Sequence, residues 1–167
     1  MGAELVAVSD AGPIIHLHEI GQLTLLRTFR EIIVPEAVWH ETVGMQRLAG
    51  EDLDELANIN IVNIAKTDIQ TFTHRFGLEK LHSGEIEGLY LCRQLDIPLF
   101  LTDDLAARKS AKSLGIQPVG SIGIILRAWK LGELSVLEAK QNLKALQQVS
   151  SLFVTPEIIE IAIRRLQ

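Results

Sequence analysis

The sequence is poor in cysteine and has no long uninterrupted apolar segment. Cys92 is the single cysteine among 167 residues, so no disulfide can form within the chain and a reducing, cytoplasmic location is expected. A Cys/His zinc site is also disfavoured, since the five histidines lack the spacing of zinc-binding motifs. The longest uncharged stretch, 113–126, is shorter than the about 20 apolar residues that a membrane-spanning helix needs. We therefore expect no membrane segment, and the first basic residue, Arg27, comes too late for a secretory signal.

The length and the composition indicate one globular domain. Apolar residues make up 47% of the chain and charged residues 22%, which are the proportions of ordinary globular proteins rather than of disordered or fibrous ones. A chain of 167 residues has about the size of a single domain. The sequence offers one weak candidate for a domain boundary, near Ser150 and Ser151. We expect the domain to cover residues 1–150, with residues 151–167 as a helical appendage packed on it.

The charges are unevenly distributed along the chain. The formal net charge of −5 does not indicate a polycation that binds nucleic acid with its whole surface. Residues 1–60 contain ten acids and three bases, whereas residues 105–130 contain five bases and no acid. This contrast predicts a local site at which an acidic region meets a basic segment.

Strand-like and helix-like segments alternate along the chain. Short apolar runs predict strands at 5–10, 31–35, 59–64, 97–102 and 118–119. Helical spacing of apolar residues predicts helices at 14–26, 36–43, 47–57, 67–76, 84–95, 103–114, 122–131, 135–147 and 156–166. Ser83 and Thr155 are the expected N-caps of two of these helices. The alternation favours an α/β fold with a mostly parallel sheet of about five short strands.

Several carboxylates lie near the predicted carboxyl ends of the strands. Asp10 ends the first strand, and Asp103 and Asp104 follow the strand at 97–102. Glu41 belongs to the helix after the second strand, and Glu85 to the first turn of the helix before the fourth. Because ligands of open parallel sheets bind at this edge, Asp10 and Asp103 should face one crevice if their strands are neighbours.

Taken singly, each of these acids has an equally good local explanation. An aspartate can form a turn or cap a helix, and a helical glutamate can simply face solvent. Several carboxylates gathered at one edge repel each other, however, and a cation would neutralise them. Because hard cations prefer oxygen ligands, Mg²⁺ or Mn²⁺ suits such a site better than zinc.

Four segments of the sequence, in this order, show similarity to a known family. They are VSDAGPIIHLHEIGQLTLL (8–26), IIVPEAVWHE (32–41), LHSGEIEGLYLC (81–92) and LFLTDDLAARKSAKSLGI (99–116). Together they cover nearly the whole chain and resemble PIN domains, in particular the VapC-like prokaryotic branch that includes toxins of toxin–antitoxin pairs. The resemblance implies a PIN-like α/β/α sandwich. It also implies a Mg²⁺- or Mn²⁺-dependent endoribonuclease that hydrolyses phosphodiester bonds of single-stranded RNA.

The same resemblance implies roles for particular residues. The catalytic acids would be Asp10, Glu41, Glu85 and Asp103. The metal ligands would be Asp10, Glu85, Asp103 and Asp104, with Glu41 acting through water or on a second ion. Typical toxins of this branch carry an aspartate at the third acidic position, whereas here Glu85 stands in a Gly-Glu motif, as in a less studied subgroup. The implied partners are RNA, an antitoxin-like protein and a second copy of the chain in a homodimer.

Three bases after the last acidic segment could contact the phosphates of RNA. Arg108 and Lys112 are four residues apart on a predicted helix, so they share a face, and Lys109 lies beside them. Cations placed in this way can hold a nucleic-acid backbone. A solvated helix face is the alternative explanation.

Three functional hypotheses follow from these residues. The first is the metal-dependent ribonuclease, and the second is a catalytically weak protein of the same fold that binds RNA or a protein partner. The third is a receiver-type signalling domain, which would require a lysine directly after the fifth strand. Here no lysine follows Pro118 and Val119 before Lys130, so this hypothesis is poor. No Gly-rich nucleotide-binding motif is present either, which argues against a dinucleotide- or NTP-dependent enzyme.

Overall fold

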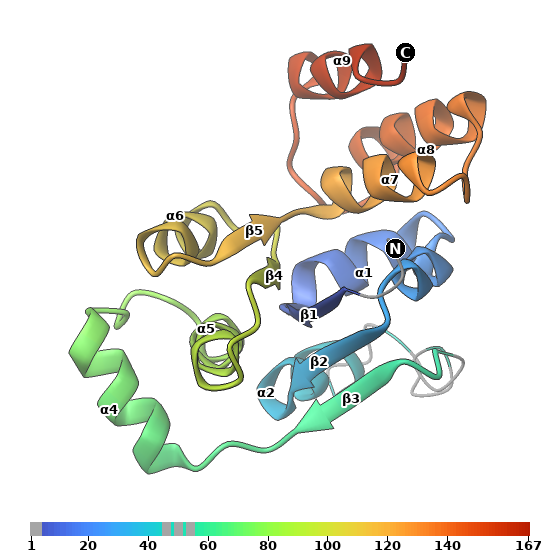
Figure 1. Ribbon diagram of the computed structural model, residues 1–167. Helices are drawn as coiled ribbons and strands as arrows, with labels where there is room; N and C mark the ends of the chain where they lie inside the picture. Colours follow the sequence, from blue (N-terminus) through green and yellow to red (C-terminus); the bar gives the residue numbers. More distant parts are fainter. Residues whose placement is uncertain (1–4, 45–47, 49–51, 53–55) are drawn as a thin grey trace.

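The computed structural model describes residues 5–44, 48, 52 and 56–167, and Figure 1 shows its architecture. The described residues form one five-stranded sheet in the order β3-β2-β1-β4-β5, and all neighbouring strands are parallel. The strands are β1 (Val6–Ser9), β2 (Glu31–Pro35), β3 (Ile59–Val62), β4 (Leu99–Leu101) and β5 (Gln117–Val119). The predicted α/β fold with a parallel sheet of about five short strands is therefore confirmed.

Helices cover both faces of the sheet, which makes the fold a three-layered α/β/α sandwich. Figure 1 shows α4, α5 and α6 on one side of the sheet and α1, α7 and α8 on the other. The helices are α1 (Ala11–Glu19), the 3₁₀ helix η2 (Leu23–Thr28), α2 (Glu36–Trp39), the π-helical turn η3 (His40–Gly44), α4 (Lys66–Phe76), α5 (Ser83–Gln94), α6 (Leu105–Ser113), α7 (Ser121–Lys130), α8 (Val136–Gln148) and α9 (Pro156–Arg164). Most of the helix predicted over 47–57 lies outside the described residues.

Alternate residues of the central strands fill two separate cores. Ala7 and Leu101 belong to the core on the side of α1, α7 and α8. Their neighbours Val8 and Phe100 belong to the core on the side of α5 and α6. This follows from strand geometry, because successive side chains of a strand point to opposite faces. Both faces are buried, which is why the strands are almost continuously apolar.

The C-terminal helix α9 shares the core of the main sheet. Ile159, Ala162 and Leu166 are buried in the same cluster as the residues of α7 and α8. Thr155 caps this helix as predicted, since its hydroxyl accepts a hydrogen bond from the Ile158 N–H. The division into residues 1–150 and an appendage over 151–167 stays a prediction.

Several helices begin at other residues than predicted, and the starts of α1 and α5 lie at the acidic edge. Helix α1 begins at Ala11 rather than at residue 14, because Asp10 caps it. Helix α5 begins at Ser83, so the predicted N-cap is wrong: His82 is the cap, and the Glu85 carboxylate accepts a hydrogen bond from its N–H. Polar residues on both sides of a helix start can satisfy its free N–H groups, so sequence alone does not distinguish Ser83 from His82.

Cys92 is buried in α5, as expected for a small apolar side chain. Its thiol donates a hydrogen bond to the Leu99 carbonyl, and burial raises its pKa to about 12. A thiol with so high a pKa is not a nucleophile at neutral pH. None of the helices within the described ranges has both the length and the apolar character needed to cross a membrane.

Candidate metal centre

The acidic site lies where the sheet order changes direction. Strands β2 and β3 follow on one side of β1, and β4 and β5 on the other. Such a switch point opens a crevice outside the carboxyl ends of the strands. Strands β1 and β4 are paired, and the Asp10 N–H donates to the Leu101 carbonyl at 2.8 Å. The segments that carry Asp10 and Asp103 are therefore neighbours, as the prediction required.

A cavity of about 420 Å³ opens at this edge. Its ionisable lining residues are Asp10, His16, Glu41, His82, Glu85, Asp103 and Asp104. They come from the ends of β1 and β4 and from α1, η3 and α5, so the fold assembles segments that are far apart in sequence. All five predicted acids line this one cavity.

Asp10 is the most deeply buried of the acids, at 6% exposure. One of its carboxylate oxygens accepts a hydrogen bond from the Ala11 N–H at 2.8 Å, and the other accepts one from the Thr102 hydroxyl at 3.0 Å. Its pKa is nevertheless raised to about 7, mainly by burial and further by the charges of Glu85 and Glu41. At neutral pH the aspartate is therefore poised between its neutral and charged forms.

Glu85 is also buried, at 6% exposure, and it is fixed by the capping box of α5. Its carboxylate accepts a hydrogen bond from the His82 N–H at 3.0 Å. Burial raises the pKa of Glu85, the hydrogen bond to His82 lowers it, and the charges of Asp104 and Glu41 raise it further. The two buried acids thus each respond to the exposed Glu41.

Gly84 keeps a small volume free between the acids. A Cβ atom at this position would lie 3.5 Å from Oε2 of Glu41 and 3.6 Å from Oδ1 of Asp10. It would also lie 3.0 Å from a methyl carbon of Val38, a tighter approach than most such contacts. The Gly-Glu motif of the sequence therefore combines a carboxylate with the space beside it.

Asp103 and Asp104 are held in different ways. Asp103 accepts hydrogen bonds from the N–H of Ser121 at 2.7 Å and from its hydroxyl at 2.5 Å. The Asp103 carboxylate also lies 2.7 Å from Nδ1 of His16. Asp104 is exposed and caps α6 through the Ala107 N–H, and its charge acts on Glu85. Asp103 is thus anchored toward α1 and α7, whereas Asp104 faces the other acids.

The donor chemistry of the cavity fits a divalent cation. Its acids offer only carboxylate oxygens, the ligands that Mg²⁺ and Mn²⁺ prefer. Burial raises the pKa of Asp10, and the charges of Glu85 and Glu41 raise it further, so a cation would stabilise its charged form. Among residues 5–44, 48, 52 and 56–167, no three His, Cys, Asp or Glu side chains are already placed to hold one ion together. Binding would therefore require rotation of at least one side chain, and the exposed Glu41 has room to rotate.

The predicted phosphate-binding bases do not line this cavity. Arg108 donates a hydrogen bond to the Thr102 carbonyl at 3.1 Å, so its guanidinium helps to hold the β4 end. Lys109 and Lys112 are exposed on α6. Their contact with RNA stays a prediction.

Sequence reasoning missed the residues that orient the acids. His16 belongs to no metal-binding motif in the sequence, yet it pairs with Asp103. Ser121 was not considered, although it begins the helix directly after β5, at the same sheet edge as Asp10. The sequence signal for this role is a serine that follows a glycine directly after a predicted strand, because such a residue lies at the carboxyl edge of the sheet. Thr102 directly precedes Asp103 in the sequence, and its hydroxyl donates a hydrogen bond to Asp10.

A comparison with protein families agrees with this geometry. Residues 6–167 match the family described as "DUF3368: PIN domain". No curated protein matches the chain. Because the family match covers nearly the whole sequence, the chain belongs to the PIN-domain family.

Proposed function

We propose that this PIN domain is an endoribonuclease that uses Mg²⁺ or Mn²⁺ to hydrolyse phosphodiester bonds of single-stranded RNA. The observation that carries the proposal is the buried Asp10, whose pKa is raised to about 7 within a cavity lined by four further acids. A cluster of this kind is unfavourable for folding by itself. It is useful when a cation occupies it, and PIN domains are typically metal-dependent nucleases.

The residues that would hold the ion are Asp10, Glu85, Asp103 and Asp104, with Glu41 acting through water or on a second ion. When bound, the ion neutralises the carboxylates and supplies the polarisation that phosphodiester hydrolysis requires. Thr102 and the Ala11 N–H orient the carboxylate of Asp10. Asp10 loses its residual proton before it can act as a full anion. His16 and Ser121 hold Asp103 in place, which limits the rotation available to it.

A nuclease assay tests this proposal directly. Purified protein would be incubated with a 5′-labelled single-stranded RNA in Mg²⁺, in Mn²⁺ or in EDTA, and the product ends would be identified. We expect cleavage that leaves 5′-phosphate and 3′-hydroxyl ends, that EDTA abolishes, and that the Asp10→Asn variant lacks. The exposed Glu160→Gln variant, which loses one charge on α9, is the matched control. Cleavage that persists unchanged in EDTA or in Asp10→Asn would refute the assigned roles.

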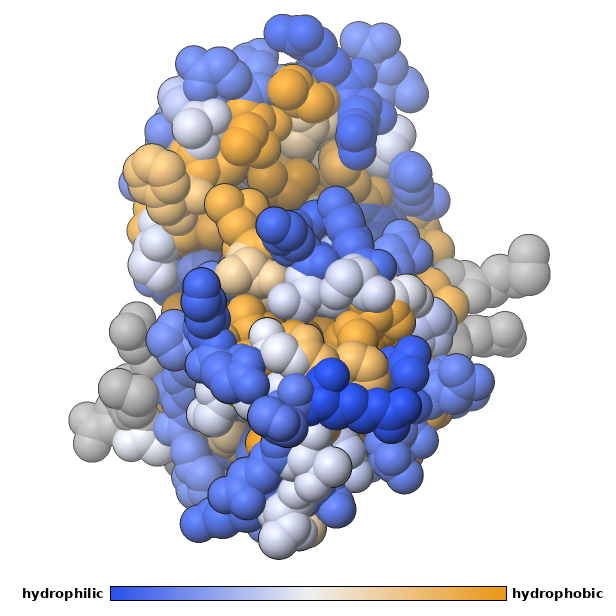
Figure 2. Space-filling model, turned by 90° about the vertical axis from the view of Figure 1, so that its left-hand side faces the viewer, coloured by the Kyte–Doolittle hydropathy of each residue, from blue (hydrophilic) through white to orange (hydrophobic). Residues whose placement is uncertain are grey.

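A second candidate function is the binding of a protein partner, and an apolar groove beside the acidic cavity favours it. The groove has a volume of about 540 Å³ and shares four lining residues with the acidic cavity: Asp103, Leu105, Leu152 and Phe153. Phe153 is 94% exposed and Leu105 82% exposed. On the face shown in Figure 2, hydrophobic side chains gather in the upper half, at the height of α7 and α9. Exposed apolar patches of this kind commonly mark protein interfaces.

The partner would be an antitoxin-like protein or a second copy of the chain, and the first of these would make the protein the toxin of a toxin–antitoxin pair. A partner seated on Phe153 would lie at the mouth of the acidic cavity and could block it. Light scattering of the purified protein separates the two partners. A dimer that Phe153→Ser dissociates supports self-association through the groove, and a monomer leaves the groove to a different protein.

A further inference from the structure

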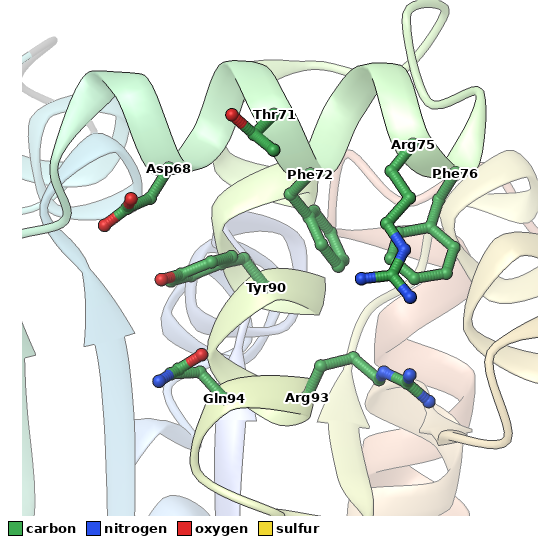
Figure 3. A pocket seen from close by; sticks show the side chains of 8 residues that line it. All are labelled: Asp68, Thr71, Phe72, Arg75, Phe76, Tyr90, Arg93 and Gln94. Carbon is green, nitrogen blue, oxygen red and sulfur yellow. The ribbon is translucent and has the colours of Figure 1, made fainter.

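A second cleft lies between helices α4 and α5, away from the acidic cavity. Its volume is about 350 Å³, and it shares no lining residue with that cavity. Figure 3 shows the side chains that line it: Asp68, Thr71, Phe72, Arg75 and Phe76 from α4, and Tyr90, Arg93 and Gln94 from α5. A cleft of this size lies within the range of small-molecule sites.

Two arginines converge at one end of the cleft. The guanidinium carbon of Arg75 lies 5.2 Å from the centre of the Phe76 ring, and that of Arg93 lies 5.6 Å from it. They come from different helices, and Figure 3 shows both guanidinium groups on the same side of the cleft. Among the described residues, neither arginine forms an ion pair with a carboxylate. Two positive charges thus face the cleft without an ion-pair partner, and the carboxylate that lines the cleft, Asp68, lies at its other end.

Packing between the helices does not require these arginines. The rings of Phe72 and Phe76 are 4.9 Å apart, and those of Phe72 and Tyr90 are 5.5 Å apart in an edge-on arrangement. These aromatic contacts already join α4 to α5. A cation over an aromatic ring at an exposed site contributes only about 0.5–1 kcal/mol, and a second like charge nearby opposes it. An anion between the two guanidinium groups would remove that repulsion.

We propose that this cleft binds the phosphate of a nucleotide. Arg75 and Arg93 hold the phosphate, because planar guanidinium groups match its oxygens in paired hydrogen bonds. The other end of the cleft offers polar groups for a base: Figure 3 shows Asp68 and Gln94 away from the guanidinium of Arg75, with Tyr90 between them. The cleft therefore presents positive charge at one end and hydrogen-bonding groups at the other, as a nucleotide requires.

The nucleotide can come from two sources with the same chemistry. It is either a free mononucleotide or one unit of a single-stranded RNA, and only the second source rests on the proposed nuclease function. If the nucleotide is part of an RNA, one RNA molecule would contact both ends of α5, because Glu85 lies in the first turn of this helix and Arg93 in its last.

Binding measurements in EDTA test the cleft separately from cleavage. One probe is 5′-CMP, whose binding is measured by calorimetry. The other is a fluorescein-labelled single-stranded RNA oligonucleotide, whose binding is measured by anisotropy and which the removal of metal by EDTA keeps intact. We expect the Arg75→Ala/Arg93→Ala double variant to weaken binding of at least one probe by about tenfold or more. For the oligonucleotide, the slope of log Kd against log salt should fall by about 0.7 for each arginine removed. The Arg75→Lys variant should recover binding only in part, since ammonium cannot form paired contacts.

The matched control is Arg164→Ala, which removes one exposed positive charge on α9 and should leave binding unchanged. Loss with the oligonucleotide alone assigns the site to RNA, and loss with 5′-CMP assigns it to a free nucleotide. The proposal is overturned if the parent binds neither probe, if the double variant binds as the parent does, or if Arg164→Ala loses as much affinity. Circular dichroism would establish that the variants are folded. If the nuclease assay shows no cleavage but the double variant still binds a probe more weakly than the parent, the proposed nuclease function is rejected and the proposed nucleotide site is retained.

Discussion

The acidic cavity and the arginine cleft, defined by Arg75 and Arg93, both gather like charges, but they differ in burial. Helix α5 contributes to both, with Glu85 near its start and Arg93 near its end. In the cavity, Asp10 and Glu85 are almost wholly withdrawn from water, whereas Arg75 and Arg93 are exposed. A buried charge changes its protonation or takes up a counter-ion, while an exposed one is mainly screened by salt. The cavity should therefore respond to pH and metal, and the cleft to ionic strength.

The largest expected effect is the loss of hydrolysis in Asp10→Asn. The substitution keeps the size of the side chain and removes the charge, so it should lower kcat at least about 100-fold, the consequence of losing several kcal/mol of electrostatic stabilisation. Single-turnover cleavage of labelled RNA in Mn²⁺ measures this. The variant should also melt at a higher temperature than the parent in EDTA, because a repelling charge is absent. A variant that loses activity by unfolding would melt lower instead.

The second prediction concerns stability as a function of pH without metal. The pKa of Asp10 is raised from its ordinary value of 3.8 to about 7, so the folded state binds the proton more tightly than the unfolded state. The protonated form of Asp10 therefore contributes fully to the free energy of unfolding below pH 4, and this contribution is lost as the pH rises toward 7. Over this range the free energy of unfolding falls by up to about 1.4 kcal/mol per pH unit. The raised pKa of Glu85 acts in the same direction.

Urea unfolding of the parent and of Asp10→Asn in EDTA, between pH 4 and pH 8, measures this slope. The difference between the two proteins isolates the contribution of Asp10 from that of other groups. Parallel curves for the parent and the variant would contradict the burial of a charged aspartate. Changes in the arginine cleft, such as Arg75→Ala, should not alter the slope over this range.

The third prediction concerns the packing of α5 against the sheet, because α5 contributes residues to both the acidic cavity and the arginine cleft. A Cβ atom on Gly88 of α5 would lie 2.4 Å from a ring carbon of Phe100, which is fully buried in β4. Gly88→Ala should therefore push α5 away from the sheet and destabilise the fold by about 1–3 kcal/mol. Urea unfolding measures the loss, and the double variant Gly88→Ala/Phe100→Leu should recover part of it. Additive effects of the two substitutions would show that this contact does not position α5.

The smallest expected effect belongs to a residue that orients an acid. His16→Ala removes the partner of Asp103 and leaves Ser121 in place, so kcat should fall only about tenfold, the weight of one hydrogen bond to a charged group. His74→Ala is the matched control, since that side chain is 94% exposed on α4 and lies outside both sites. Equal activity of the two variants would mean that His16 does not position Asp103.

The sequence was sufficient to predict the strands and the edge at which the acids meet. Asp10 and Asp103 follow runs of apolar residues, and the carboxyl ends of parallel strands share one side of a sheet. The pairing of His16 with Asp103 was not predictable, because it joins α1 to the β4 end across 87 positions of the chain. The arginine cleft was also missed: Arg75 and Arg93 belong to different helices, and only the packing angle of these helices brings them together.

The most direct test of the central claim is calorimetric titration of the metal-free protein with Mn²⁺ in buffers of different ionisation enthalpy. At pH 6.5, part of the Asp10 population is protonated, so an ion that binds there must release protons, and the observed heat should change with the buffer. We predict buffer-dependent heat for the parent at pH 6.5, little dependence at pH 8.5, and weakened binding without proton release for Asp10→Asn. Absence of Mn²⁺ binding, or equal titrations for the parent and the variant, would contradict a shared metal site.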